Sequence, residues 1–153
     1  MKRFITQWIL PPALALMAAS AAAEPVANRD DAVAIVRAAV QYLKKHGKEK
    51  GYAEISNPKG LFVRGELYVV AVTLDGTVLA HGANPRLIGK YIYAMRDVDG
   101  KLFVQEQAKL ARDVGSGWVD YRGLNPVSQA MEDKTAYVER LDDMMVASGI
   151  YRK

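Results

Sequence analysis

The chain has 153 residues, of which half are hydrophobic and a quarter are charged, and its formal net charge is +4. Cysteine is absent, which excludes disulfides, thiolate metal sites and covalent haem attachment. The lysines and arginines are dispersed along the chain, which argues against nucleic acid as a partner.

The first 23 residues are expected to form a secretory signal peptide. Two basic residues at 2–3 precede an apolar run over 4–17, and the alanines at 21–23 form a small-residue cleavage site. An uncleaved membrane anchor is the alternative, but the run barely reaches the roughly 20 residues that span a bilayer. Cleavage would leave residues 24–153, with 19 basic and 17 acidic side chains, as one periplasmic or secreted domain.

A long amphipathic helix is expected over residues 28–46. Asn28 or Asp30 can cap it, because a side-chain oxygen accepts hydrogen bonds from the free backbone amides of the first turn. Gly47 is a typical stop signal, and a short helix is expected at 49–55. The apolar stripe that would face the core consists of Val33, Val36, Val40 and Leu43, widened by Ala32, Ile35 and Ala39.

A hairpin follows, with strands at 67–73 and 77–80 joined by a turn that contains Asp75-Gly76. The return strand ends on His81. The next residues, 82–85, form a loop that cannot continue a sheet, because Pro85 lacks an amide proton.

The remaining elements are a loop with a helical turn at 86–93, a helix over 102–113, and three further strands. The strands are expected at 118–122, 135–141 and 144–151, with a tight turn at Asp142-Asp143. Strands joined by tight turns must be antiparallel. The strand at 67–73 is apolar on both faces and therefore needs cover on both sides.

These elements predict an α+β fold. The long N-terminal helix would pack on one face of a five-stranded antiparallel sheet, and segment 82–115 would cover the other face. Loops over a sheet leave a cavity more readily than a packed helix does. A ligand pocket is therefore expected on the side of segment 82–115.

Several short motifs follow one another along the chain, namely 67–90, Asp97-Val98-Asp99-Gly100-Lys101, Gly117-Trp118-Val119-Asp120-Tyr121, Asn125-Pro126, Lys134-x-x-Tyr137 and Ser148-Gly149-Ile150-Tyr151. In their order and spacing they resemble the single Cache domain, a PAS-like extracytoplasmic sensing module of chemoreceptors and sensor kinases. The resemblance covers nearly all of residues 24–153. It implies binding of a small solute, often a carboxylate, over one face of the sheet.

The resemblance also implies partners, namely a small organic anion and a membrane receptor or sensor kinase. Receptor Cache domains usually lie between two membrane helices, whereas this sequence shows no second apolar span. It is therefore expected to act as a solitary secreted domain, alone or as a homodimer.

Three residues are the main candidates for contacting the ligand. His81 can hydrogen-bond to a ligand oxygen, or it can be satisfied by the backbone. Lys134, expected at the start of its strand, can pair with a carboxylate or be an ordinary solvated lysine. Tyr121 shares a face with Val119 and is expected to offer its hydroxyl to the ligand.

Three other groups of residues are weaker candidates. Trp118 lies three positions before Tyr121, so in a regular strand the two point to opposite faces, and only a bulge would bring both to one pocket. Tyr91 and Tyr93 in the covering segment can close the pocket. Arg64 and Arg86 can act as anion clamps, and Tyr68 is expected in the core.

No enzymatic motif, cofactor-binding motif or metal-ligand pattern is evident. Asp97-x-Asp99-Gly100 starts like a calcium loop, but its twelfth position is Ala108 rather than glutamate. Two function classes remain. One is a binding module for a small carboxylate or similar polar metabolite, and the other is a ligand-free interaction protein that keeps the fold.

Overall fold

The computed structural model describes residues 25–152, so the predicted signal peptide lies outside the described residues. Within them the chain forms three α-helices, one short 3-10 helix and six strands. No helix of the described part is both long and apolar enough to cross a membrane.

Helix α1 (Arg29–His46) begins at a complete capping box. Asn28 Oδ1 accepts hydrogen bonds from the amides of Asp30 (2.8 Å) and Asp31 (3.1 Å), and Asp31 Oδ2 accepts one from the Asn28 amide (2.8 Å). Such a cap contributes about 1 kcal/mol to stability. The helix ends at Gly47, and α2 (Lys48–Ile55) follows at once.

The strands form one antiparallel sheet in the order β1-β2-β6-β5-β4, with β3 also paired to β2. The strands of this sheet are β1 (Val63–Arg64), β2 (Leu67–Thr73), β3 (Val78–His81), β4 (Ser116–Leu124), β5 (Met131–Leu141) and β6 (Met144–Arg152). The first and last long strands, β2 and β6, are therefore neighbours in the middle of the sheet. This arrangement confirms the predicted α+β architecture.

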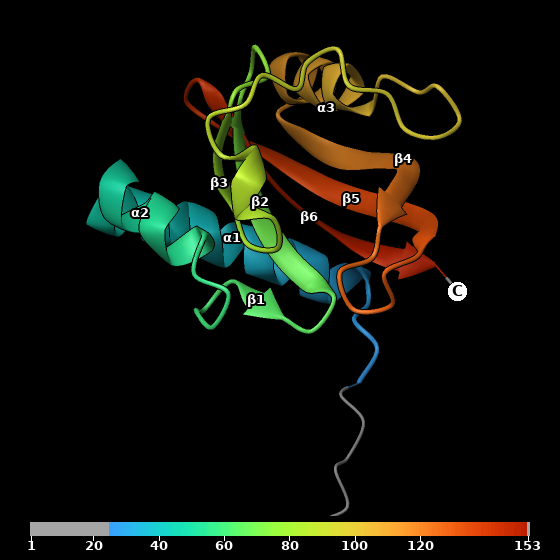
Figure 1. The fold of residues 1–153 in the computed structure, drawn as a ribbon. Coiled ribbons are helices and arrows are strands. Elements are labelled where there is room, and N and C mark those ends of the chain that lie inside the picture. Colours follow the sequence, from blue (N-terminus) through green and yellow to red (C-terminus); the bar gives the residue numbers. More distant parts are fainter. Residues whose placement is uncertain (1–24, 153) are drawn as a thin grey trace, which may run out of the picture.

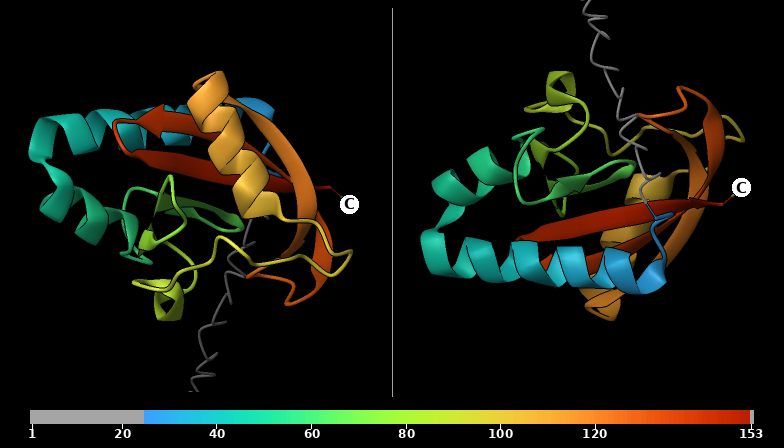
Figure 2. Two further views of the ribbon diagram at one scale, coloured as in Figure 1. Left: turned by 90° about the horizontal axis from the view of Figure 1, so that it is seen from above. Right: turned by 90° about the horizontal axis from the view of Figure 1, so that it is seen from below.

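Figure 1 shows how the helices are arranged around the sheet. Each face of the sheet has its own apolar core. The first, the α1-side core, packs the predicted stripe of α1 against the sheet; six of its seven residues are buried and Val33 is half-buried. The second, the α3-side core, lies beneath α3 (Phe103–Asp113), which covers the opposite face together with residues 82–102. Figure 2 shows α1 and α3 on opposite sides of the sheet.

The structure differs from the sequence prediction in the number and the bounds of its strands, and β4 extends two residues further at each end than predicted. Strand β1 was not predicted, because a two-residue strand carries no periodicity; it exists through its pairing with Leu67 and Tyr68. Strand β3 begins at Val78, while Thr77 forms an isolated bridge with Tyr91. Strand β5 begins four residues earlier than predicted, at Met131, because its first residues pair with β4 up to Leu124.

Candidate functional site

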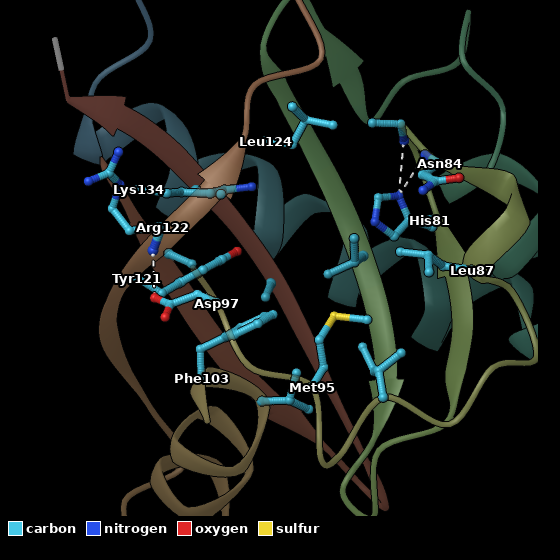
Figure 3. A pocket seen from close by; sticks show the side chains of 18 of the residues that line it. His81, Asn84, Leu87, Met95, Asp97, Phe103, Tyr121, Arg122, Leu124 and Lys134 are labelled. Carbon is cyan, nitrogen blue, oxygen red and sulfur yellow. Dashed lines mark hydrogen bonds between the residues drawn. The ribbon is translucent and has the colours of Figure 1, made fainter. Parts of the chain in front are cut away.

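A cavity of about 440 Å³ lies between the sheet and the covering segment, on the face opposite α1. Its walls come from β2, β3, β4, β5 and β6, from the loops on either side of η1 (Pro85–Leu87), and from the first turns of α3 (Figure 3). Its volume is in the range of small-molecule sites. The prediction of a cavity on this side agrees with the structure.

Lys134 is the central polar residue of the cavity. It lies inside β5, paired with Tyr121 of β4 and Tyr151 of β6, and not at a strand start as predicted. Only 4% of the residue is exposed. Its Nζ donates hydrogen bonds to the hydroxyls of Tyr68 (3.0 Å) and Tyr151 (3.2 Å), and it lies 4.3 Å from the centre of the Tyr68 ring.

The Lys134 ammonium has no negatively charged partner among residues 25–152. Burial by itself lowers the pKa of Lys134, but the oxygens of Tyr121, Tyr68 and Tyr151 outweigh burial and raise it above its ordinary value. Burial raises the pKa of Tyr121 and of Tyr151, so both hydroxyls stay protonated at neutral pH. The site therefore holds a desolvated positive charge that a ligand can compensate.

Two glycines make room for the stem of Lys134. A Cβ on Gly149 of β6 would lie 2.6 Å from Lys134 Cε and 2.8 Å from the Thr135 carbonyl oxygen. A Cβ on Gly123 of β4 would lie 3.1 Å from Lys134 Cδ, which is a flexible side-chain atom. Gly149 therefore sets the path of the lysine, whereas Gly123 only borders it.

Replacing Gly149 with alanine should displace Lys134 and destabilise the protein by about 1–3 kcal/mol, the usual cost of overpacking. The backbone contact with Thr135 leaves little room for relaxation. Urea denaturation measures the loss, and Gly123→Ala is the matched control with a smaller expected loss. Equal losses in the two variants would show that Gly149 has no special role.

His81 lies at the end of β3, with its ring stacked on Tyr68 at 5.2 Å between centres. Its Nδ1 accepts hydrogen bonds from the amides of Ala83 (3.1 Å) and Asn84 (2.9 Å). Burial, assisted by the charge of Lys134, lowers the pKa of His81 to about 4. At neutral pH the ring is therefore uncharged, and its proton is on Nε2, which is available as a donor.

His81 should make stability depend on pH between about 4 and 6.5. The unfolded histidine takes up a proton near pH 6.5, while the folded one does so near pH 4. The unfolded state thus holds more protons in this window, so the free energy of unfolding falls as the pH is lowered through it. The expected loss from His81 between pH 7 and 4 is about 2–4 kcal/mol, since one pKa unit corresponds to about 1.4 kcal/mol.

Urea denaturation at a series of pH values tests this dependence. His81→Asn keeps an acceptor for the two loop amides but removes the titrating group, so the slope between pH 4 and 6.5 should flatten. The same substitution at the exposed His46 is the control. A slope that survives in His81→Asn would assign the pH dependence to other groups.

Tyr121 and Trp118 point to opposite faces of β4, because the β4–β5 register is regular and contains no bulge. Tyr121 lines the cavity and stacks on Phe103 with ring centres 4.3 Å apart. Trp118 packs on the α1-side core, where the Arg29 guanidinium lies 4.4 Å from its ring centre. Trp118 is therefore not brought to this cavity.

The remaining candidates lie outside the cavity lining. Tyr93 packs half-buried against the α3-side core, and Tyr91 is 65% exposed. Arg64 and Arg86 are exposed and do not line the cavity either. The structure thus brings together His81, Tyr121 and Lys134 of the predicted set, and their contact with a ligand stays a prediction.

Sequence reasoning missed Tyr68 and Tyr151, which hold the lysine. Tyr68 was assigned to the core, yet it lines the cavity and contacts both His81 and Lys134. Tyr151 donates a hydrogen bond to the Leu124 carbonyl (2.8 Å) and so fixes the oxygen that faces Lys134. Alternation on β2 places Tyr68 with Val70 and Val72, but only the sheet order shows which face this is.

Asp97 is the one carboxylate among the described residues that line the cavity. It accepts hydrogen bonds from the amides of Arg122 (2.9 Å), Lys101 (2.9 Å) and Asp99 (3.0 Å). These bonds, that from Arg122 above all, lower the pKa of Asp97. Within residues 25–152, no group of three or more histidine, aspartate or glutamate side chains is placed to hold a metal ion.

The fold and the cavity define the class of an α+β, PAS-like sensor domain. The chain belongs to the family described as single Cache domain 2, whose match covers residues 13–153. The methyl-accepting chemotaxis protein McpP of Pseudomonas putida is 33% identical over 80 residues, which cover 51% of this chain and 15% of that receptor. The alignment therefore spans only a small part of the relative.

Solved structures of sensor domains have a fold similar to that of this chain. The periplasmic sensor domain of a chemotaxis protein is 25% identical, with a TM-score of 0.66 and coverage of 81% of this chain and 90% of that one. A Cache chemosensory domain that recognises carboxylic acids is also 25% identical, with a TM-score of 0.69 and coverage of 81% and 92%. The resemblance to Cache sensor domains is thus confirmed.

Proposed function

We propose that this domain senses a small organic carboxylate outside the cytoplasm, by binding it in the cavity beside Lys134. The observation that carries the proposal is the buried ammonium, whose hydrogen-bond partners are tyrosine hydroxyls and not carboxylates. A buried charge without a counter-charge is costly, and an anionic ligand removes that cost.

The groups around Lys134 suit the two oxygens of a carboxylate. One oxygen can accept from the ammonium, which is charged at neutral pH. The other can accept from a neutral donor, such as the Nε2–H of His81 or the hydroxyl of Tyr121, both of which line the same cavity. The carboxylic-acid-recognising Cache domain with the same fold supports this assignment.

Matched ligands test the proposal on the purified protein. Propanoate, propanamide and propylamine have similar shapes but differ in charge, so only propanoate should raise the thermal midpoint. A ligand at about 100 times its dissociation constant adds about 2.7 kcal/mol to stability. Equal shifts with propanamide would contradict recognition of an anion. No shift across a wider set of carboxylates would leave the interaction-protein function as the better explanation.

The proposed place of action is the periplasm, after cleavage behind Ala23, with a membrane signalling protein as the partner that reads the bound state. The periplasmic sensor-domain relative supports this location. Cell fractionation followed by N-terminal sequencing checks it, and the expected first residue is Glu24. Recovery solely from membranes with Met1 intact would contradict cleavage.

A further inference from the structure

The β4–β5 loop, residues 125–130, is built around one buried side chain, that of Asn125. This residue is only 1% exposed. Its Oδ1 accepts hydrogen bonds from the amides of Val127 (2.9 Å) and Ser128 (3.3 Å). The two bonds close the first turn of the loop on the side chain of its first residue.

The amide nitrogen of the same side chain ties the loop to its surroundings. Asn125 Nδ2 donates hydrogen bonds to Glu66 Oε2 and Glu132 Oε2, both at 2.9 Å. Glu66 belongs to the turn between β1 and β2, which lies beside the β4–β5 loop (Figure 1). Every donor and acceptor of the Asn125 amide is therefore engaged, and a buried network that is fully satisfied in this way is rigid.

The peptide group between Leu124 and Asn125 is held on both sides. The Asn125 amide donates to the Ala130 carbonyl (2.9 Å), and the Leu124 carbonyl accepts from the Tyr151 hydroxyl (2.8 Å). Because a peptide group is planar, these two bonds fix its orientation. The Leu124 carbonyl thus stays directed at Tyr151.

Tyr151 carries this order to the ligand site. Its hydroxyl has one proton, which goes to Leu124, so its oxygen can accept from Lys134 Nζ at 3.2 Å. A second N–H of the ammonium goes to the Tyr68 hydroxyl at 3.0 Å. An ammonium has three N–H groups, so the third has a defined direction. The Lys134 side chain points into the cavity, where a ligand can accept that bond (Figure 3).

Asn125 is not among the residues that line the cavity, although Leu124 and Pro126 on either side of it are. We propose that Asn125 is a positioning residue of the ligand site, which acts on the Lys134 ammonium through Tyr151. The inference rests on the proposed function, because it takes a carboxylate at Lys134. It adds a residue that does not touch the ligand and yet sets its affinity.

Titration calorimetry with propanoate and a double-mutant cycle test this route. Asn125→Ala and Tyr151→Phe should each weaken binding about tenfold, the usual value of a hydrogen bond to a charged group. Both changes break the same connection, so the double variant should bind no more weakly than the weaker single variant. Losses that multiply in the double variant would show that Asn125 acts by another route and would overturn the inference.

Ser128→Ala is the matched control. It removes a hydrogen bond from the same loop to Glu132 (2.7 Å), but it keeps the backbone amide that Asn125 accepts. Its affinity for propanoate should equal that of the wild type. A loss as large as that of Asn125→Ala would mean that any disturbance of the loop weakens binding, and it would contradict a particular role of Asn125.

Glu66 offers a second test should Asn125→Ala fail to fold, because Glu66 is half-buried and outside the cavity lining. Glu66→Ala removes one acceptor of Asn125 and should weaken propanoate about twofold or more, as expected for coupling through a network. Loss of a negative charge would by itself favour an anion, so the expected sign is the opposite of a charge effect. Glu66→Gln keeps an oxygen acceptor and should not weaken binding. Unchanged or stronger binding in Glu66→Ala would refute the positioning role.

The NMR signal of the Lys134 ammonium tests the connection without a ligand. Lys134→Met assigns the signal by its loss, and burial shields the ammonium protons from exchange with water. The signal should shift or broaden in Asn125→Ala and stay unchanged in Ser128→Ala. A wild-type signal in Asn125→Ala would overturn the inference. If no carboxylate binds the wild type while the signal responds to Asn125→Ala, the proposed function fails and the positioning of Lys134 by Asn125 stands.

Discussion

Replacing Lys134 with methionine is expected to weaken carboxylate binding at least thirtyfold while the protein stays folded. Among the described residues that line the cavity, Lys134 is the only buried cation, and its ammonium donates hydrogen bonds of 3.0 and 3.2 Å to Tyr68 and Tyr151. Losing one partner of a desolvated charged contact costs about 2–5 kcal/mol, which is roughly thirtyfold to several thousandfold in affinity.

The same substitution is expected to leave the unliganded protein as stable as the wild type, or more so by up to about 2 kcal/mol. Methionine has a similar length and is uncharged, and replacing buried charges with apolar groups is often neutral or stabilising. The tyrosines keep other contacts, since Tyr151 still donates to the Leu124 carbonyl and its hydroxyl lies 3.4 Å from that of Tyr68. Loss of binding would therefore not be a consequence of unfolding.

Titration calorimetry gives the affinity and urea denaturation gives the free energy of unfolding. Lys90→Met is the matched control, because it removes the same charge from an exposed position outside the cavity lining. It should leave both quantities unchanged. Wild-type affinity in Lys134→Met would move the binding site elsewhere and contradict the proposed function.

Replacing Val40 with aspartate is expected to destabilise the protein by about 3–5 kcal/mol, the cost of leaving a charge buried without a partner. Val40 is 2% exposed and lies on the face of α1 that packs against the sheet. The sheet side of this contact is apolar, so the carboxylate would find no compensation. Many domains have a total stability of about 5–15 kcal/mol, so this variant can approach unfolding.

Circular dichroism during urea denaturation measures the effect. Ala38→Asp places the same charge on the exposed face of α1, two residues away, and should cost less than about 1 kcal/mol, mainly through helix propensity. A loss below about 0.5 kcal/mol in Val40→Asp would be typical of a surface position. It would contradict the packing of α1 on the sheet.

Much of the fold could be predicted from periodicity and stop signals. The stripe of α1 and the Asp75-Gly76 turn are local patterns, and both appear where they were predicted. The early start of β5 could not be predicted in this way. Residues 131–134 lack a strand-like alternation, and they are held in the sheet by their pairing with β4 and β6. Such pairing depends on segments that are distant in the sequence, so the periodicity of a few neighbouring residues does not reveal it.

The candidate site was predicted only in part, for the same reason. His81 is marked by its place between a strand and a loop, and Lys134 by the resemblance to Cache domains. Their connection through Tyr68 joins residues 66 positions apart in the sequence, so it depends on the order of β2, β6 and β5. The role of Gly149 could not be predicted from the sequence either, because this glycine leaves space for the side chain of Lys134 on another strand.

By itself, the sequence determined the α+β class, the buried face of α1, the antiparallel hairpins and the resemblance to an extracytoplasmic sensing domain, because each follows from local spacing or from the order of short motifs. Only the tertiary structure decided that Lys134 is buried, that tyrosine hydroxyls surround it in place of carboxylates, and that Trp118 faces away from the cavity. Burial and charge compensation depend on what lies across the sheet and above it. Those neighbours come from strands and loops far away in the chain, and folding alone brings them together.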